Sequence, residues 1–212
     1  MAGIFNKHKS LWSQKSFLQA TLLGLLFLAI GLFITYWANF YTTIHVSNSV
    51  TDIILDNLPV VNVDFIYSEG ALIFFIIVGI VLFYEPRYIP FILKSTALFI
   101  LIRSVFMMLT HLAPPPHGSY VDAEDLIYKF SSGDDLFFSA HTGLPFLLAF
   151  IFWNEKYLKY FFILATAIGG VVVLLGHLHY SIDVFSSLFI AFGIFHIAKL
   201  LFQKDYRLLV AR

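Results

Sequence analysis

The chain carries two histidines and an aspartate in the otherwise apolar stretch 176–184, Gly-His-Leu-His-Tyr-Ser-Ile-Asp-Val. His179 and Asp183 are four residues apart, so on a helix they share one face. Ionisable groups at a membrane boundary are energetically costly, so their presence favours a functional role. We therefore expect His179 to act as a nucleophile and Asp183 to orient its ring. The alternative is a polar helix end, with His179 capping the helix and Asp183 solvated.

A second stretch, residues 135–142, reads Asp-Leu-Phe-Phe-Ser-Ala-His-Thr, and Arg103 stands in another apolar segment. Phosphoryl transfer needs a nucleophile, an acid for the leaving oxygen and positive charge on the phosphate oxygens. His179 would supply the first, since attack of its ring nitrogen on phosphorus gives a phosphohistidine. His141 would protonate the leaving oxygen. Arg103 would bind the phosphate, and Ser139 would add a donor at the start of a helix.

Each of these side chains also has a purely structural interpretation. Arg103 could extend to the outer head groups, and His141 could be a core histidine with satisfied hydrogen bonds. His177 fits a boundary or supporting residue better than a catalyst. His177, His179 and Asp183 could bind zinc, but residues two apart on a helix face different ways, so the sequence predicts no metal and no cofactor. Two further histidines are expected in loops or at the membrane interface: His111 and His117.

The composition predicts an all-α integral membrane protein. Of the 212 residues, 59% are hydrophobic and 12% are charged, and the mean hydropathy is +0.85. So few charges cannot cover the surface of a soluble domain of this length. The formal net charge of zero gives no indication of a nucleic-acid partner. The absence of cysteine from this chain excludes disulfides, thiolate metal sites and cysteine nucleophiles.

We expect one domain over residues 1–212, folded as a bundle of six transmembrane helices. Each apolar run is close to the roughly 20 residues that a bilayer helix needs. The predicted spans are about 16–40, 63–84, 91–112, 135–153, 160–178 and 180–202. Residues 1–15 are polar and basic, and residues 50–58 have an amphipathic pattern that suits the membrane interface. The sequence gives no indication of the oligomeric state.

The distribution of lysine and arginine predicts the orientation. These residues fall in the N-terminal segment, in the turns at 85–90 and 154–159, and in the C-terminal tail. The loops at 41–63 and 113–134 contain only one of them, Lys129. The positive-inside rule therefore places both termini in the cytoplasm. Both candidate histidines, the aspartate and the arginine then share one depth, at the extracytoplasmic or lumenal face of a plasma membrane or endomembrane.

These stretches resemble the type-2 phosphatidic acid phosphatase superfamily and, within it, the sphingomyelin-synthase-like branch. Residues 135–142 are similar to the family's Gly-Asp…Phe-Ser-Gly-His-Thr segment, and residues 177–184 are similar to its His-Tyr-Thr-x-Asp-Val segment. A third stretch, from Arg103 to Pro114, is similar to an Arg…Leu-Thr-x-Leu-Pro segment on the third span. The order of six spans resembles that family along most of the chain.

The resemblance implies an enzyme that acts on membrane lipids at the outer or lumenal leaflet, without a metal, through His141, His179 and Asp183. The reaction that we expect is the transfer of a phosphobase from a glycerophospholipid to a ceramide or diacylglycerol-like alcohol. One alternative is a lipid phosphate phosphatase of the same superfamily, with water as the acceptor. Another is a non-catalytic membrane bundle or a lipid transporter that keeps the fold.

The chain departs from the family pattern at several positions. Ala140 replaces the usual glycine before the histidine, and Asp134 stands where a glycine is expected. Val173 occupies the position of an arginine in the general phosphatase pattern, and Thr96 occupies that of a lysine. The loss of these two cations argues against an ordinary phosphatidic acid phosphatase and leaves Arg103 as the one obvious phosphate ligand.

Overall fold

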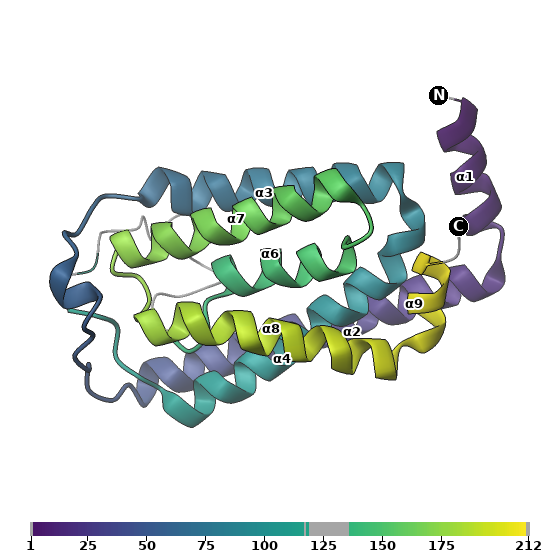
Figure 1. The fold of residues 1–212 in the computed structure, drawn as a ribbon. Coiled ribbons are helices and arrows are strands. Elements are labelled where there is room, and N and C mark those ends of the chain that lie inside the picture. The colour runs from purple at the N-terminus through teal and green to yellow at the C-terminus, as the bar shows by residue number, and fades with distance from the viewer. Residues whose placement is uncertain (1, 117, 119–135, 211–212) are drawn as a thin grey trace.

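The structure is a computed structural model that describes residues 2–116, 118 and 136–210 (Figure 1). Within these residues it contains helices and turns but no strand. The long helices are α2 (Lys15–Ile44), α3 (Asp64–Tyr84), α4 (Ile89–Thr110), α7 (Lys156–Leu175) and α8 (Ser181–Leu201). The shorter ones are α1 (Ala2–Trp12), α6 (Ala140–Ile151), α9 (Gln203–Val210) and the 3-10 turns η1 (Leu55–Asn57) and η2 (Pro86–Tyr88). Some sequence predictions lie outside the described residues: those on His117, Lys129, Asp134 and Asp135.

Five helices in the described part of the chain are long and apolar enough to cross a membrane. Two of them, α3 and α8, begin and end within one residue of the spans predicted at 63–84 and 180–202. The outer sides of α2 and α3 expose large apolar side chains, such as Phe33 and Phe65. Continuous apolar surfaces of this kind suit the hydrocarbon of a bilayer rather than water. The protein is therefore an integral membrane protein.

The helix predicted at 135–153 is shorter than expected. α6 has 12 residues and begins only at Ala140. At 1.5 Å per residue it is about 18 Å long, well below the roughly 30 Å of a bilayer core. Residues 136–139, which were expected to be helical, follow a non-helical path instead. In the described residues, the expected six spans are thus five full-length helices and one short one.

Two helices occupy the ends of the chain, which the sequence predicted to be polar segments outside the spans. α1 occupies most of the basic N-terminal segment, and α9 occupies the C-terminal tail. α9 is held against the bundle by a buried ion pair of 2.6 Å between Asp205 on α9 and Lys94 on α4. Two buried opposite charges stabilise one another where either alone would be costly. The C-terminal helix therefore belongs to the folded bundle.

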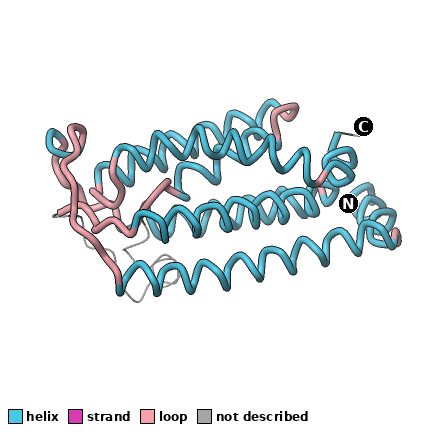
Figure 2. The backbone as a smooth tube through the Cα atoms, turned by 90° about the horizontal axis from the view of Figure 1, so that it is seen from below, coloured by secondary structure: helices cyan, strands magenta, loops and turns pink. Residues whose placement is uncertain are grey.

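α6 lies at the centre of the bundle. It packs against both α7 and α8, while α2 packs along α4, and α4 contacts α8 (Figure 1). Large buried aromatic side chains fill the space between these helices: Phe91, Phe99, Phe138, Phe152 and Phe162. The connecting loops before α3 and α8 lie at one end of the bundle, and α1 and α9 lie at the other (Figure 1 and Figure 2). Both candidate histidine stretches are at the loop end.

Candidate active site

A tight turn after α7 places His179. The N–H of Leu178 donates to the carbonyl of Val173 (2.9 Å), and the N–H of His177 donates to that of Leu174 (3.1 Å). This pair of bonds is a Schellman motif, with His177 in the left-handed position that glycine usually occupies (φ 51°). Histidine reaches this region more readily than most residues, but with some strain. The turn reverses the chain within five residues, so α8 starts directly after His179.

His179 and Asp183 form a buried pair at the start of α8. The Nδ1 atom of His179 lies 3.3 Å from Oδ2 of Asp183, and the same oxygen accepts the main-chain N–H of Tyr180 at 3.1 Å. The side chains are almost inaccessible, with exposed fractions of 3% for His179 and 0% for Asp183. No described residue makes a hydrogen bond to the other ring nitrogen of His179, Nε2. The aspartate thus lies within hydrogen-bonding distance of Nδ1. The sequence predicted this pair on one helical face, but His179 precedes α8, so the contact forms across the start of the helix.

The segment before α6 has an unusual main-chain conformation. Phe137 and Phe138 both have positive φ, 120° and 34°. Such conformations cost on the order of 1–3 kcal/mol each for non-glycine residues and tend to cluster at functional sites. The next residue, Ser139, donates its N–H to the carbonyl of Asp183 at 3.1 Å. The strained turn therefore joins the start of α6 to the start of α8.

His141 is the second residue of α6 and lies near the same pair. Its ring stacks on that of Tyr67 at the start of α3, with centroids 4.1 Å apart and an interplanar angle of 28°. It is close enough to His179 and Arg103 for their charges to act on it. The side chain is partly exposed. The structure therefore places His141 at the same end of the bundle as His179, against Tyr67 of α3.

Arg103 reaches the same region from α4. It is 6% exposed, and its Nε donates to the carbonyl of Phe138 at 3.1 Å. Its Nη1 lies 3.1 Å from the sulfur of Met107. These contacts hold the guanidinium inside the bundle against the strained segment, and not out among lipid head groups. Arg103 thus supports the main chain next to Ser139 and brings a permanent positive charge to this end.

Three buried polar atoms at the two motifs have no hydrogen-bond partner in the described structure. They are Oγ of Ser139, Oγ1 of Thr142 and Oδ1 of Asp183. Buried polar groups in folded proteins are almost always satisfied, so these three atoms are candidates for hydrogen bonds to a substrate. Hydroxyl groups can donate to phosphate oxygens. No group of three or more His, Asp or Glu side chains among the described residues is arranged to hold a metal ion.

Asp52 is not among the site residues predicted from the sequence, but it caps the helix that carries Asp183. Its Oδ2 accepts the N–H of Ser181, the first residue of α8, at 2.6 Å. Its Oδ1 accepts the N–H groups of Ile54 (2.9 Å) and Leu55 (3.2 Å). Burial alone would raise the pKa of Asp52, but these hydrogen bonds outweigh it and hold the pKa below its ordinary value. A carboxylate at a helix N-terminus is also favoured by the helix dipole.

The rest of the segment 45–63 is tied to the same turn. The carbonyl of Leu58 lies 3.2 Å from Nε2 of His177. The hydroxyl of Tyr180 accepts the N–H of Val50 at 3.2 Å and donates to the carbonyl of Ala113 at 3.0 Å. This segment therefore packs against the loop end of the bundle and stabilises the turn that positions His179. The ring of His177 thus contacts this segment, and its role as a supporting residue stays a prediction.

Two adjacent glycines on α7 allow the helices to approach closely. A Cβ on Gly169 would clash with the carbonyl oxygen of His141, and a Cβ on Gly170 would lie 3.2 Å from the side chain of Val184. α7 thus contacts the first turns of both α6 and α8. The Gly-Gly pair in an apolar run was the available sequence signal, since glycine allows close main-chain approach. Tyr67 and Asp52 gave no such signal, because their partners are far away in the sequence.

The comparison with protein families gives one match. Residues 133–200 match the family model described as PAP2 superfamily C-terminal. These 68 of the 212 residues include both histidine stretches, α6, α7 and nearly all of α8. The comparisons with curated proteins and with solved structures gave no match. The structure brings the five residues predicted for the site, His141, His179, Asp183, Arg103 and Ser139, to one end of the bundle. Over these residues the chain is similar to the PAP2 superfamily, and the match supports a lipid phosphatase or phosphotransferase enzyme.

Proposed function

We propose that this protein is a lipid phosphotransferase of sphingomyelin-synthase type. It would move a phosphobase from a glycerophospholipid to the hydroxyl of a ceramide or a diacylglycerol-like alcohol. The observation that carries the proposal is the buried His179–Asp183 pair, 3.3 Å apart, joined through Ser139 to α6, whose second residue is His141. This arrangement offers a nucleophile, a group that orients it and a separate acid.

In the first step, Nε2 of His179 attacks the phosphorus of the donor lipid. An N–P bond forms, and the P–O bond to the diacylglycerol oxygen breaks. Asp183 accepts the Nδ1–H and favours the positive charge that develops on the ring. Protonated His141 gives its proton to the leaving oxygen, so diacylglycerol departs as a neutral alcohol. The product is a phosphohistidine that carries the phosphobase.

In the second step, the hydroxyl of the acceptor lipid attacks the same phosphorus. His141, now neutral, takes the hydroxyl proton, and the N–P bond breaks. The pentacoordinate phosphorus carries negative charge on its oxygens in both steps. Arg103 supplies a permanent positive charge, and Ser139 Oγ and the first N–H groups of α6 supply donors. This route uses no metal.

We place the site at the extracytoplasmic or lumenal surface. The support is the positive-inside pattern together with the position of α1 and α9 at the end opposite the histidines (Figure 1). A glycosylation acceptor inserted in the segment 45–63 should be modified in microsomes, and one inserted at Asn154 should not. Modification at Asn154 alone would reverse the orientation.

A lipid phosphate phosphatase is the second candidate, because the family match supports it equally. It would use the same first step, with water as the second acceptor. Against it stand Val173 and Thr96, which occupy positions where the general phosphatase pattern has cations. The two activities differ only in the acceptor, so product analysis separates them.

The experiment uses the purified full-length protein in vesicles that contain head-group-labelled phosphatidylcholine and a short-chain ceramide or diacylglycerol. Transferase activity places the label on the added acceptor, with no need for a metal. Release of free phosphate from phosphatidic acid, without transfer, would favour the phosphatase. A lack of both products across several head groups, compared with His179→Ala, would favour a non-catalytic bundle.

A further inference from the structure

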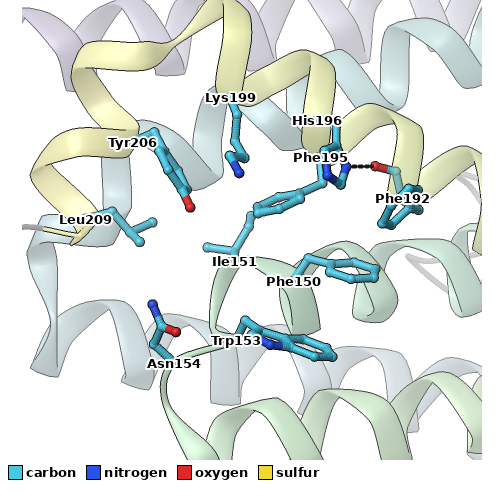
Figure 3. Close-up of a pocket in the computed structure, with 10 residues that line it drawn as sticks. All are labelled: Phe150, Ile151, Trp153, Asn154, Phe192, Phe195, His196, Lys199, Tyr206 and Leu209. Carbon is cyan, nitrogen blue, oxygen red and sulfur yellow. Dashed lines mark hydrogen bonds between the residues drawn. The ribbon is translucent and has the colours of Figure 1, made fainter.

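A cavity lies at the end of the bundle opposite the histidines. It has a volume of about 280 Å³ and lies between the end of α6, the second half of α8, and α9 (Figure 3). Lys199 follows Asp183 by sixteen positions, which corresponds to about 24 Å along the helix. The cavity therefore lies near the other membrane surface. It is separate from the residues of the proposed reaction, and ligand binding there does not depend on that reaction.

The cavity contains a cation without a carboxylate partner. The ammonium of Lys199 lies 5.3 Å from the ring centroid of Phe195 and 4.9 Å from that of Tyr206. In the part of the chain that the structure describes, Lys199 makes no ion pair, whereas nearby Lys94 pairs with Asp205 at 2.6 Å. Cation–π contacts orient the ammonium but do not neutralise it. The cavity is thus electropositive.

Two neutral donors point into the same space as Lys199. Figure 3 shows the amine of Lys199, the hydroxyl of Tyr206 and the side-chain amide of Asn154 directed toward the middle of the cavity. None of these groups makes a hydrogen bond with another described residue. No carboxylate of the described residues lines the cavity. An ammonium, a hydroxyl and an amide together provide the donors that phosphate oxygens accept.

The rim of the cavity suits a lipid. Trp153 and Phe192 line it and are about half exposed, at 51% and 48%. The ammonium of Lys159 lies 4.8 Å from the ring of Trp153, which adds positive charge at the edge. Exposed aromatic rings beside lysines at helix ends are typical of the membrane–water interface. A free phosphate ion would use the donors but not this apolar rim.

We infer that this cavity binds the phosphate head group of an anionic glycerophospholipid in the leaflet opposite the histidines, with the acyl chains against Trp153 and Phe192. Its volume is at the small end of the range for ligand pockets, so it accepts a head group rather than a whole lipid. A zwitterionic choline lipid fits less well, because its cation would face Lys199 without a carboxylate to bind it. A single lysine contact of this kind corresponds to roughly fivefold enrichment.

Trp153 provides the test. The full-length protein carrying Trp12→Phe and Trp37→Phe retains it as the sole tryptophan. This protein is placed in phosphatidylcholine vesicles that contain either brominated phosphatidylglycerol or brominated phosphatidylcholine at the same mole fraction. Bromine on the acyl chains quenches a nearby indole. We expect stronger quenching by the anionic lipid, corresponding to roughly fivefold enrichment at Trp153.

Lys199→Gln should abolish this preference, and Lys204→Gln, an exposed lysine on α9 away from the cavity, should leave it unchanged. Tyr206→Phe keeps the ring under Lys199 and should reduce the preference partly, so the inference remains testable if Lys199→Gln does not fold. Equal quenching by both lipids in the parent protein would overturn the inference. So would equal losses in Lys199→Gln and Lys204→Gln, which would indicate diffuse surface charge. Loss of the preference on addition of millimolar inorganic phosphate at constant ionic strength would assign the cavity to a free anion instead.

Discussion

The main-chain N–H of Ser139 donates a hydrogen bond of 3.1 Å to the main-chain carbonyl of Asp183. This bond joins the first turn of α6, which carries His141, to the first turn of α8, which carries Asp183. Because only main-chain atoms take part, side-chain substitutions at either histidine or at Asp183 leave it in place. Such variants therefore test the chemistry of the side chains rather than the assembly of the site.

His177 should tolerate glycine much better than a β-branched residue. Glycine keeps the left-handed position of the Schellman motif and loses only the contact with Leu58, about 0.5–1.5 kcal/mol. Valine at φ 51° should cost roughly 1–2 kcal/mol more, because its Cβ meets the main chain. Thermal unfolding in detergent and turnover of the two variants provide the measurement. If His177→Gly is as inactive as His179→Ala while remaining folded, the His177 side chain takes part in the reaction.

Asp52→Ala should lower the free energy of unfolding by about 0.5–2 kcal/mol at neutral pH, the usual cost of losing a helix cap. The carboxylate has its pKa lowered in the folded state, so its contribution is present above the ordinary pKa of about 4 and is lost as the pH falls through the folded value. The difference in unfolding free energy between the parent protein and Asp52→Ala should therefore become smaller below about pH 4.

The matched control for Asp52 is Asp56→Ala, an exposed carboxylate in the same loop. It should change the unfolding free energy by no more than about 0.5 kcal/mol. Two results would show that Asp52 does not cap α8 as a carboxylate. One is equal destabilisation by the two substitutions, and the other is a difference in unfolding free energy between the parent protein and Asp52→Ala that grows as the pH falls.

Local sequence patterns predicted some of these features and not others. The apolar runs that became α3 and α8 are bounded by polar residues, so their limits were predicted to within one residue. The pairing of His179 with Asp183 was predicted, but for the wrong reason: His179 lies before the start of α8, so the two side chains meet across the helix N-terminus and not on one helical face. The late start of α6 was missed, since positive φ at Phe137 and Phe138 is imposed by tertiary contacts such as that with Arg103 and not by residue type.

Other features depend on pairings across the chain. Asp52 and Ser181 are 129 residues apart, and no local pattern connects them. The turn after α7 was also not predicted from the sequence. Glycine usually marks the left-handed position, but here His177 occupies it and Gly176 stands one residue earlier. α1 and α9 were missed for a different reason. Both are short and polar, and such helices depend on contacts with the bundle, as the Lys94–Asp205 ion pair shows for α9.

Gly169→Ala should disturb the site, because the added Cβ meets the carbonyl oxygen of His141. Either α7 or α6 must move, so we expect destabilisation of on the order of 1–3 kcal/mol and a loss of turnover. Gly193→Ala on α8 is the control, since a Cβ there meets nothing within 4 Å. It should be neutral or stabilising by up to about 1 kcal/mol. Unchanged turnover in Gly169→Ala would show that the close approach of α7 to His141 is unnecessary.

The distinct roles of the acid and the nucleophile predict different responses to the leaving group. His141→Ala lacks the proton donor, so natural lipids should react on the order of 10²–10⁴-fold more slowly. A donor whose leaving group is nitrophenol needs no proton and should recover much of that loss. Asp183→Asn should lower the reaction rate by a similar factor with both donors. The positive charge on the His179 ring lacks its carboxylate partner, whichever leaving group departs. If the two variants respond equally to the leaving group, His141 and Asp183 do not have the separate roles that the mechanism assigns to them.

Trapping of the phosphoenzyme tests the central claim most directly. The protein is mixed with a nitrophenyl phosphodiester lipid labelled in the phosphate, quenched at alkaline pH and separated from lipid. We predict an acid-labile, alkali-stable label in the parent protein, in His141→Ala and in His45→Ala, an exposed histidine at the same end of the bundle. His179→Ala should carry no label. Label that persists in His179→Ala and disappears in His141→Ala would show that the nucleophile is His141 and would contradict the proposed mechanism.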